Sequence, residues 1–147
     1  MRTLHNIDLK NNESGFTLRW QDRLILSHTA DAPCLWIGAG EADIEMFRGN
    51  FSIKDKLNEK IALTNATVTQ QSAGWAIRFT RGDAVSATLL VGVDAEGRLE
   101  LKLKNDAASH NRIWLRLAAQ PDDHIYGCGE QFSYFDLRGK PFPLWTS

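Results

Sequence analysis

The sequence contains few cysteines and no long apolar run. Only Cys34 and Cys128 occur among 147 residues, and they lack the paired spacing of a zinc site. Two distant cysteines could still form a disulfide, but we expect buried free thiols, because the first six residues contain no apolar run suited to a signal peptide. No stretch approaches the roughly 18 apolar residues of a membrane span. We therefore expect a cytoplasmic protein with no membrane partner.

An excess of basic residues is missing as well. Seventeen Lys and Arg oppose 18 Asp and Glu, which leaves a net charge of −1. Domains that bind nucleic acids usually carry a basic excess or a basic stripe, so the composition argues against a nucleic-acid partner. The rest of the composition, 43% apolar and 24% charged, is ordinary for one globular domain with its own core.

The apolar residues mostly alternate with polar ones. This period of two occurs in segments 16–20, 75–79, 85–93, 99–103 and 113–117. Alternation places one face of a strand inward and the other toward water or a second layer. Because short turns such as Gln21-Asp22-Arg23 and Asp94-Ala95-Glu96-Gly97 separate the segments, the pattern predicts an all-β fold, an antiparallel β-sandwich. Only two short segments, 42–48 and 54–60, could be helical.

Two glycine pairs invite comparison with nucleotide-binding loops. Gly38-Ala39-Gly40 and Gly127-Cys128-Gly129 both lack the third glycine, the following helix and the βαβ setting that would place a phosphate at a helix end. We expect these glycines to serve turns, bulges or tight backbone packing.

Histidines and serines form no recognisable catalytic or metal-binding pattern. No two histidines stand at ligand spacing, and no nucleophile-elbow pattern frames a serine. We expect no metal and no cofactor, and we interpret the histidines as surface or turn residues: His5, His28, His110 and His124.

Carboxylates are numerous, but their spacing pairs none of them. Glycosidic cleavage needs two carboxyl groups across one sugar, and nothing sets Asp43, Glu45, Asp55, Glu130 or Asp136 in such a pair. We therefore predict no catalytic residue in this chain and expect solvated carboxylates or turn caps. Glu130 stands out between glycine and an aromatic run, where we favour a structural role at a crowded turn.

Tryptophans fall into two groups. Trp20, Trp36, Trp75 and Trp114 lie within strand patterns and are expected to pack in the core or between layers. Trp145 lies outside these patterns, in an aromatic and proline-containing tail, residues 131–147. A domain seldom exposes such a tail, so we expect the chain to belong to a longer one, or to form a homodimer through the tail. Trp145 could line a sugar site or pack on the rest of the protein.

The segment Ile125-Tyr126-Gly127-Cys128-Gly129-Glu130 resembles the Tyr-Gly-x-Gly-Glu motif near the end of the N-terminal domain in glycoside hydrolase family 31. Segments 47–56 and 111–147 are similar to the sulfoquinovosidase branch of that family. The resemblance implies a galactose-mutarotase-like sandwich over residues 1–130, and a loop beginning at 131–147 that leads toward a (β/α)8 barrel. The parent would be a retaining α-glycosidase that acts on sulfoquinovosides or other α-glycosides, with both catalytic aspartates on the barrel.

By the same resemblance, this chain is an accessory domain that packs on the barrel and contributes a loop to the substrate pocket. Glu130, Gln131 and Trp145 are the substrate-loop candidates. A stand-alone carbohydrate-binding module is the alternative function. Two further hypotheses are a sugar epimerase with the mutarotase fold, for which no convincing His–Glu pair occurs, and an assembly domain.

Overall fold

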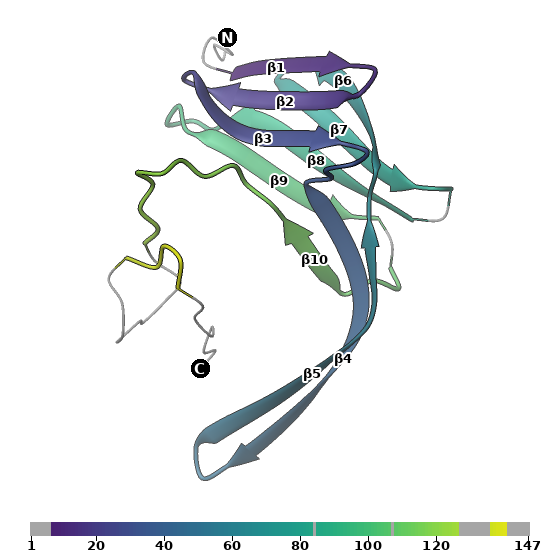
Figure 1. The fold of residues 1–147 in the computed structure, drawn as a ribbon, viewed down its shortest axis with the longest axis vertical. Helices are drawn as coiled ribbons and strands as arrows, with labels where there is room; N and C mark the ends of the chain where they lie inside the picture. Colours follow the sequence, from purple (N-terminus) through teal and green to yellow (C-terminus); the bar gives the residue numbers. More distant parts are fainter. Residues whose placement is uncertain (1–6, 84, 107, 127–135, 141–147) are drawn as a thin grey trace.

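The computed structural model describes residues 7–83, 85–106, 108–126 and 136–140, and these contain ten strands and no helix (Figure 1). The all-β prediction is therefore confirmed for the described residues. The strands are β1 (Ile7–Asn12), β2 (Gly15–Trp20), β3 (Arg23–Thr29), β4 (Leu35–Phe47), β5 (Asn50–Ala62), β6 (Asn65–Gln71), β7 (Gly74–Arg81), β8 (Val85–Val93), β9 (Leu99–Asn105) and β10 (Arg112–Leu115).

The strands form three antiparallel sheets. Their orders are β1-β2-β3, β10-β4-β5 and β6-β7-β8-β9. The β1-β2-β3 sheet lies over the four-stranded sheet, and the lower halves of β4 and β5 continue away from both (Figure 1). One core cluster joins all three sheets, with Phe16, Leu18 and Leu26 from the first, Leu35 and Ile37 from the second, and Ile77, Phe79 and Leu89 from the third. This is the predicted sandwich.

Alternation decides which residues enter this core. On β8, Ala87, Leu89 and Val91 are almost fully buried, whereas the intervening Leu90 is 40% exposed. Burying a side chain of the size of leucine stabilises the fold by about 1.5–3 kcal/mol. The same period of two produced the correct strand predictions for β2, β7, β8, β9 and β10.

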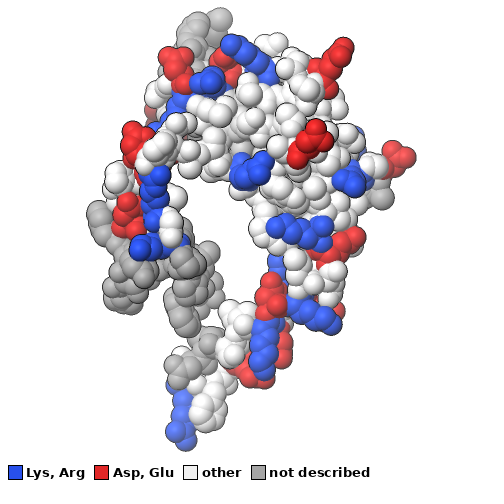
Figure 2. Space-filling view, viewed as in Figure 1, with Lys and Arg blue, Asp and Glu red and all other residues white. Residues whose placement is uncertain are grey.

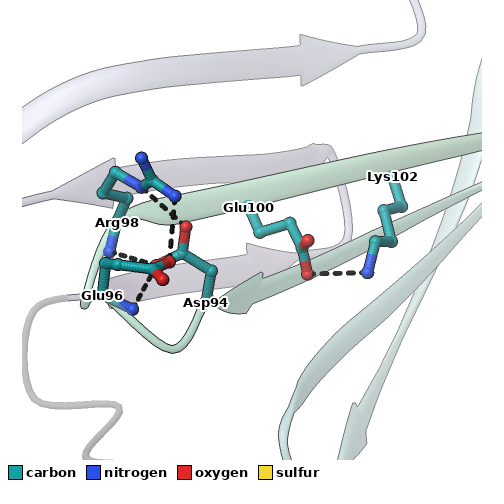
Figure 3. A network of polar contacts seen from close by, with 5 residues as sticks. All are labelled: Asp94, Glu96, Arg98, Glu100 and Lys102. Atoms are coloured by element: carbon teal, nitrogen blue, oxygen red, sulfur yellow. Dashed lines mark hydrogen bonds and ion pairs between the residues drawn. The ribbon is translucent and has the colours of Figure 1, made fainter.

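Two predicted turns are confirmed and have clear local causes. Gln21 and Asp22, between β2 and β3, both have positive φ, 51° and 65°, as in the two-residue turns that match strand twist. Between β8 and β9, Asp94 accepts hydrogen bonds from the backbone N–H groups of Glu96 and Arg98 and pairs with the Arg98 side chain at 2.7 Å (Figure 3). The bonds from Arg98 and Glu96 lower the pKa of Asp94.

The two segments that could be helical are strands instead. Residues 42–48 fall largely in β4 and residues 54–60 in β5, and they pair across the ladder, with Ala42 opposite Asp55 and Ile44 opposite Ile53. Alanine, glutamate, lysine and methionine favour helices when read locally. Pairing between the two segments overrides that preference, because each residue then finds its partner on the other strand. Strands β1 and β6 had no counterpart among the predicted segments.

His28 is not a surface or turn residue, so that interpretation is wrong for it. The ring is 1% exposed, stacks on Phe16 at 5.5 Å and meets the edge of Phe79 at 5.2 Å. Its Nδ1 accepts the Cys34 N–H at 3.3 Å, and its Nε2 lies 3.2 Å from the Thr64 carbonyl, where it donates. Burial lowers the pKa of His28, so the ring is neutral. The inward alternation of Leu26 and His28 on β3 was the missed signal.

Cys34 is a buried free thiol, as predicted, and burial raises its pKa to about 11. Its sulfur lies 3.7 Å from Nδ1 of His28. A thiol with a raised pKa in an apolar setting is a packing group rather than a nucleophile. Cys128 lies outside the described residues.

Candidate functional site

The residues predicted to shape a substrate pocket cannot be placed. Glu130, Gln131 and Trp145 lie outside the described residues, as does the predicted boundary between residues 130 and 131. The structure does describe the chain on both sides of residues 127–135, namely 116–126 and 136–140. These two flanking stretches contact each other, and we call the contact region of residues 120–126 and 136–140 the stem.

Asp136 is the centre of the stem. Its carboxylate accepts hydrogen bonds from His124 Nδ1 at 2.6 Å, from the Ile125 N–H at 3.1 Å and from the Arg138 N–H at 3.0 Å. These three bonds, led by that of His124, lower the pKa of Asp136 to about 2. The carboxylate therefore caps a turn, as predicted for it, and is held ionised at neutral pH. His124, exposed beside it, is a surface residue as predicted.

Leu137 and Arg138 complete the stem. The Leu137 side chain is only 3% exposed, and its N–H donates to the Ile125 carbonyl at 2.8 Å. The Arg138 guanidinium donates to the carbonyls of Pro121 and Asp123. Asp123 also forms an ion pair with Arg23 at the start of β3, so the stem is tied to the sandwich. This arrangement could not be predicted from the sequence, because a His and an Asp twelve residues apart match no recognised motif.

The stem joins the end of the stretch 120–126 to the start of the stretch 136–140. Its bonds join backbone and side-chain groups from 121–125 to groups from 136–138. The predicted loop candidates Glu130 and Gln131 lie in sequence between these two stretches.

A second surface lies on the β10-β4-β5 sheet, on the face opposite the core. We call it the outer face. Trp36 and Trp114 are cross-strand partners there, and the Lys60 ammonium lies over both rings, 5.6 and 4.5 Å from their centroids. The Arg116 guanidinium lies 5.4 Å from the Trp36 ring. Trp20 and Trp75, by contrast, pack against the core as predicted, whereas that prediction is wrong for Trp36 and Trp114, because alternation on β4 and β10 points both away from the core.

Asn111 and Arg112 tie the start of β10 to β4 and β5 at the point where these two strands leave this face. The Asn111 amide bonds both the N–H and the carbonyl of Gly40, at 3.0 and 2.9 Å, beside a bulge in β4. Arg112 donates to Asp55 on β5 at 2.7 Å, which lowers the pKa of Asp55. We call these contacts of Asn111 and Arg112 the root clamp. The neighbouring His110 side chain is 8% exposed, and its Nε2 lies 3.3 Å from Glu59 without hydrogen-bond geometry.

The glycine predictions are confirmed at this root. A Cβ on Gly38 would lie 2.4 Å from the Glu59 carbonyl oxygen and 2.9 Å from the Trp114 ring, so only glycine fits. Gly40 follows the bulge. The second glycine pair, Gly127 and Gly129, lies outside the described residues.

The other carboxylate candidates lie apart from the stem. Asp43 and Glu45 are exposed on β4, and Glu45 pairs with Lys54 at 3.4 Å. Among the described residues, no group of three or more His, Cys, Asp or Glu could hold a metal ion. Nor do they include a helix long and apolar enough to cross a membrane. Charges of both signs are interspersed over the visible face (Figure 2).

Comparison with known proteins gives a consistent result. The sulfoquinovosidase of Escherichia coli strain K12 is 72% identical over 144 residues, which are 98% of this chain and 21% of that protein. The sulfoquinovosidase of Agrobacterium fabrum is 40% identical over 145 residues, 94% of this chain and 20% of that protein. A solved structure of a GH31 family sulfoquinovosidase from E. rectale, in complex with the aza-sugar inhibitor IFGSQ, superimposes with a TM-score of 0.76. It is 34% identical and covers 95% of this chain and 20% of that one.

The chain therefore spans about a fifth of the length of the relatives it matches. A family model described as the glycosyl hydrolase 31 N-terminal galactose mutarotase-like domain matches residues 23–147. Fold, sequence identity and family model agree: the chain belongs to the N-terminal galactose mutarotase-like domains of glycoside hydrolase family 31.

Proposed function

We propose that this chain is the N-terminal accessory domain of a retaining α-glycosidase that acts on sulfoquinovosides. The observation that carries the proposal is the 72% identity to a sulfoquinovosidase over 98% of the chain. The two further relatives bear the same name and have the same length ratio. The acid and the nucleophile then belong to the remainder of the parent, a (β/α)8 barrel, since retaining hydrolysis needs two carboxyl groups about 5–5.5 Å apart across the sugar.

The domain's contribution is to pack on the barrel and to supply one wall of the substrate pocket. The contact of His124 and Ile125 with Asp136 supports this role, because it fixes the described residues that precede and follow Glu130 and Gln131 in the sequence. Trp145 offers an indole face on which a sugar can stack. Neither a metal nor a cofactor enters this role.

The parent enzyme tests both levels of the proposal. Full-length parent should hydrolyse p-nitrophenyl α-sulfoquinovoside with a far higher kcat/KM than p-nitrophenyl α-glucoside. In that background, Gln131→Ala and Trp145→Ala should raise KM or lower kcat, whereas Lys10→Ala, an exposed control on β1, should change neither. An active parent with unchanged constants in both loop variants would refute the loop role. A parent that ignores the sulfoquinovoside would refute the substrate class.

A stand-alone carbohydrate-binding module is the second candidate, favoured by the two tryptophans on the outer face. Lys60 and Arg116 lie over those rings, however, where a sugar would have to stack. Titration calorimetry with sulfoquinovose distinguishes the two functions. A Kd below about 1 mM for the isolated chain, which is a binding free energy of roughly 4 kcal/mol, would favour the carbohydrate-binding module.

We also propose a cytoplasmic location, which the free thiol of Cys34 supports, because free thiols are typical of reducing compartments. Fractionation of cells that express the parent would test the location.

A further inference from the structure

The distal halves of β4 and β5 form a two-stranded ribbon that extends away from the sandwich (Figure 1). We call residues 41–57 the arm. Its ladder runs from Glu41 opposite Lys56 to Phe47 opposite Asn50. No other strand among the described residues pairs with it. A two-stranded ribbon is marginally stable in water unless one face is covered.

The two faces of the arm differ in chemistry. Alternation places Ile44 opposite Ile53 on the outer face, with Met46 two positions along β4 and Leu57 opposite Gly40. These four side chains are highly exposed, at 61%, 56%, 69% and 45% respectively. The other face carries Glu41, Asp43, Glu45, Lys54 and Lys56 together with Phe47, which is 70% exposed, and acidic and basic side chains lie side by side along the arm (Figure 2).

The charged face places acidic and basic residues opposite each other, whereas no other strand among the described residues covers the apolar face. Lys54 pairs with Glu45 at 3.4 Å, and the opposing rows carry opposite charge. On the apolar face Ile44, Ile53 and Met46 are neighbours, and Leu57 lies beyond the Ala42–Asp55 pair. Large apolar side chains exposed on one face of a ribbon mark an interaction surface. The root clamp orients this surface, because Asn111 forms two hydrogen bonds with Gly40 and Arg112 donates a hydrogen bond to Asp55. The arm is therefore preorganised for a partner.

The size of the surface indicates which partner it fits. A stable interface between separate molecules uses about 20–30 residues on each side, whereas the whole arm, residues 41–57, has 17. A partner in the same polypeptide needs much less contact, because linkage supplies an effective concentration in the millimolar range. The relatives are about five times as long as this chain, so a parent of that length would contain further domains that could pack against the arm.

We propose that the apolar face of the arm is the surface on which the remainder of the same polypeptide packs. The proposal rests on the proposed function, because it requires a parent chain with a further domain. It names the docking surface within that parent, and the outer face of the same sheet, with Trp36 and Trp114, continues it toward the sandwich.

Cysteine labelling in the full-length parent tests the proposal. Ile44→Cys places a thiol on the apolar face, and Glu45→Cys places the matched control one residue away on the charged face. Each variant reacts with a maleimide, and peptide mass spectrometry reads the modified site, so native cysteines do not interfere. We expect labelling of Ile44→Cys to be at least tenfold slower than that of Glu45→Cys in the folded parent. Both should react equally in urea.

Ile53→Cys repeats the test from β5 and replaces Ile44→Cys if that variant does not fold. Slow labelling at every protein concentration supports packing within one chain. Slow labelling that is lost on dilution to monomers overturns the proposal in favour of a second copy. Equal labelling of both faces overturns it outright. Hydrolysis assays on the same samples keep the two questions apart, because a parent that protects the arm but ignores sulfoquinovosides contradicts only the proposed function.

Discussion

His28 offers the sharpest physical prediction, because a titratable ring lies in the apolar core. Its Nδ1 accepts the Cys34 N–H and its Nε2–H donates to the Thr64 carbonyl, so a second ring proton would find the first position occupied by a donor. Phe16 and Phe79 exclude water from the rest of the ring. Burial accordingly lowers the pKa of His28 below its unfolded value of about 6.5.

The sign of the pH dependence follows from this lowered pKa. Above about pH 6.5 neither state is protonated at His28 and the contribution of the neutral ring is fully present. As the pH falls through 6.5 the unfolded chain binds a proton that the folded chain refuses, so the free energy of unfolding decreases. The loss has an upper bound of about 1.4 kcal/mol per pH unit, and integration from pH 7.5 to 5.5 gives about 1.4 kcal/mol.

Urea unfolding at these two pH values measures the effect. We expect His28→Leu to be less stable than the wild type at pH 7.5, because the Cys34 N–H and Thr64 carbonyl lose their partner at a cost of about 1–3 kcal/mol each. The variant should nevertheless lose less stability between pH 7.5 and 5.5 than the wild type, by up to the amount above. Equal losses in the two proteins would refute the neutral buried ring. Lys10→Ala, a substitution at an exposed position of β1, controls for unspecific effects.

Three further predictions concern the core, the arm root and the stem. Leu89→Ala should lower the free energy of unfolding by about 2–5 kcal/mol in urea titrations, whereas Leu90→Ala, on the exposed face of β8, should change it by less than about 1 kcal/mol. Gly38→Ala should cost about 1–3 kcal/mol, because its Cβ meets the Trp114 ring and a backbone oxygen; an unchanged transition midpoint would contradict the close approach. Asp136→Asn should lower kcat/KM of the parent. The Asp136 carboxylate should also contribute to the free energy of unfolding of the wild type, and this contribution should be lost as the pH falls from about 3.8 toward about 2, because the folded carboxylate stays ionised where the unfolded one is protonated. An Asp136→Asn variant with the same dependence of stability on acid pH would contradict the stem.

The sandwich was predictable because its signal is local. Val85 to Val93 alternates strictly, and the structure buries one set of these residues and exposes the other. The turn at Gln21 and Asp22 was predictable for the same reason, since polar residues interrupt two apolar runs. Local order of this kind depends on neighbours two positions apart.

The arm and the stem were not predictable, because each depends on pairs distant in sequence. Ile44 finds Ile53 only across the β4–β5 ladder, and helix-favouring neighbours hide the alternation. Asp136 meets His124 only because the chain turns back on itself. His28 was misjudged from residue type, although its alternation with Leu26 placed it inward. The family resemblance, by contrast, identified the correct family from the Tyr126–Glu130 motif and the segments beside it.

The most direct test of the account is the rate at which residues 1–147, purified alone, release p-nitrophenol from p-nitrophenyl α-sulfoquinovoside, measured beside an equal concentration of the full-length parent. The isolated chain should release p-nitrophenol no faster than buffer, and the parent should release it rapidly, because both catalytic carboxylates are assigned to the remainder of the enzyme. Turnover by the isolated chain above the buffer rate would contradict its assignment as an accessory domain.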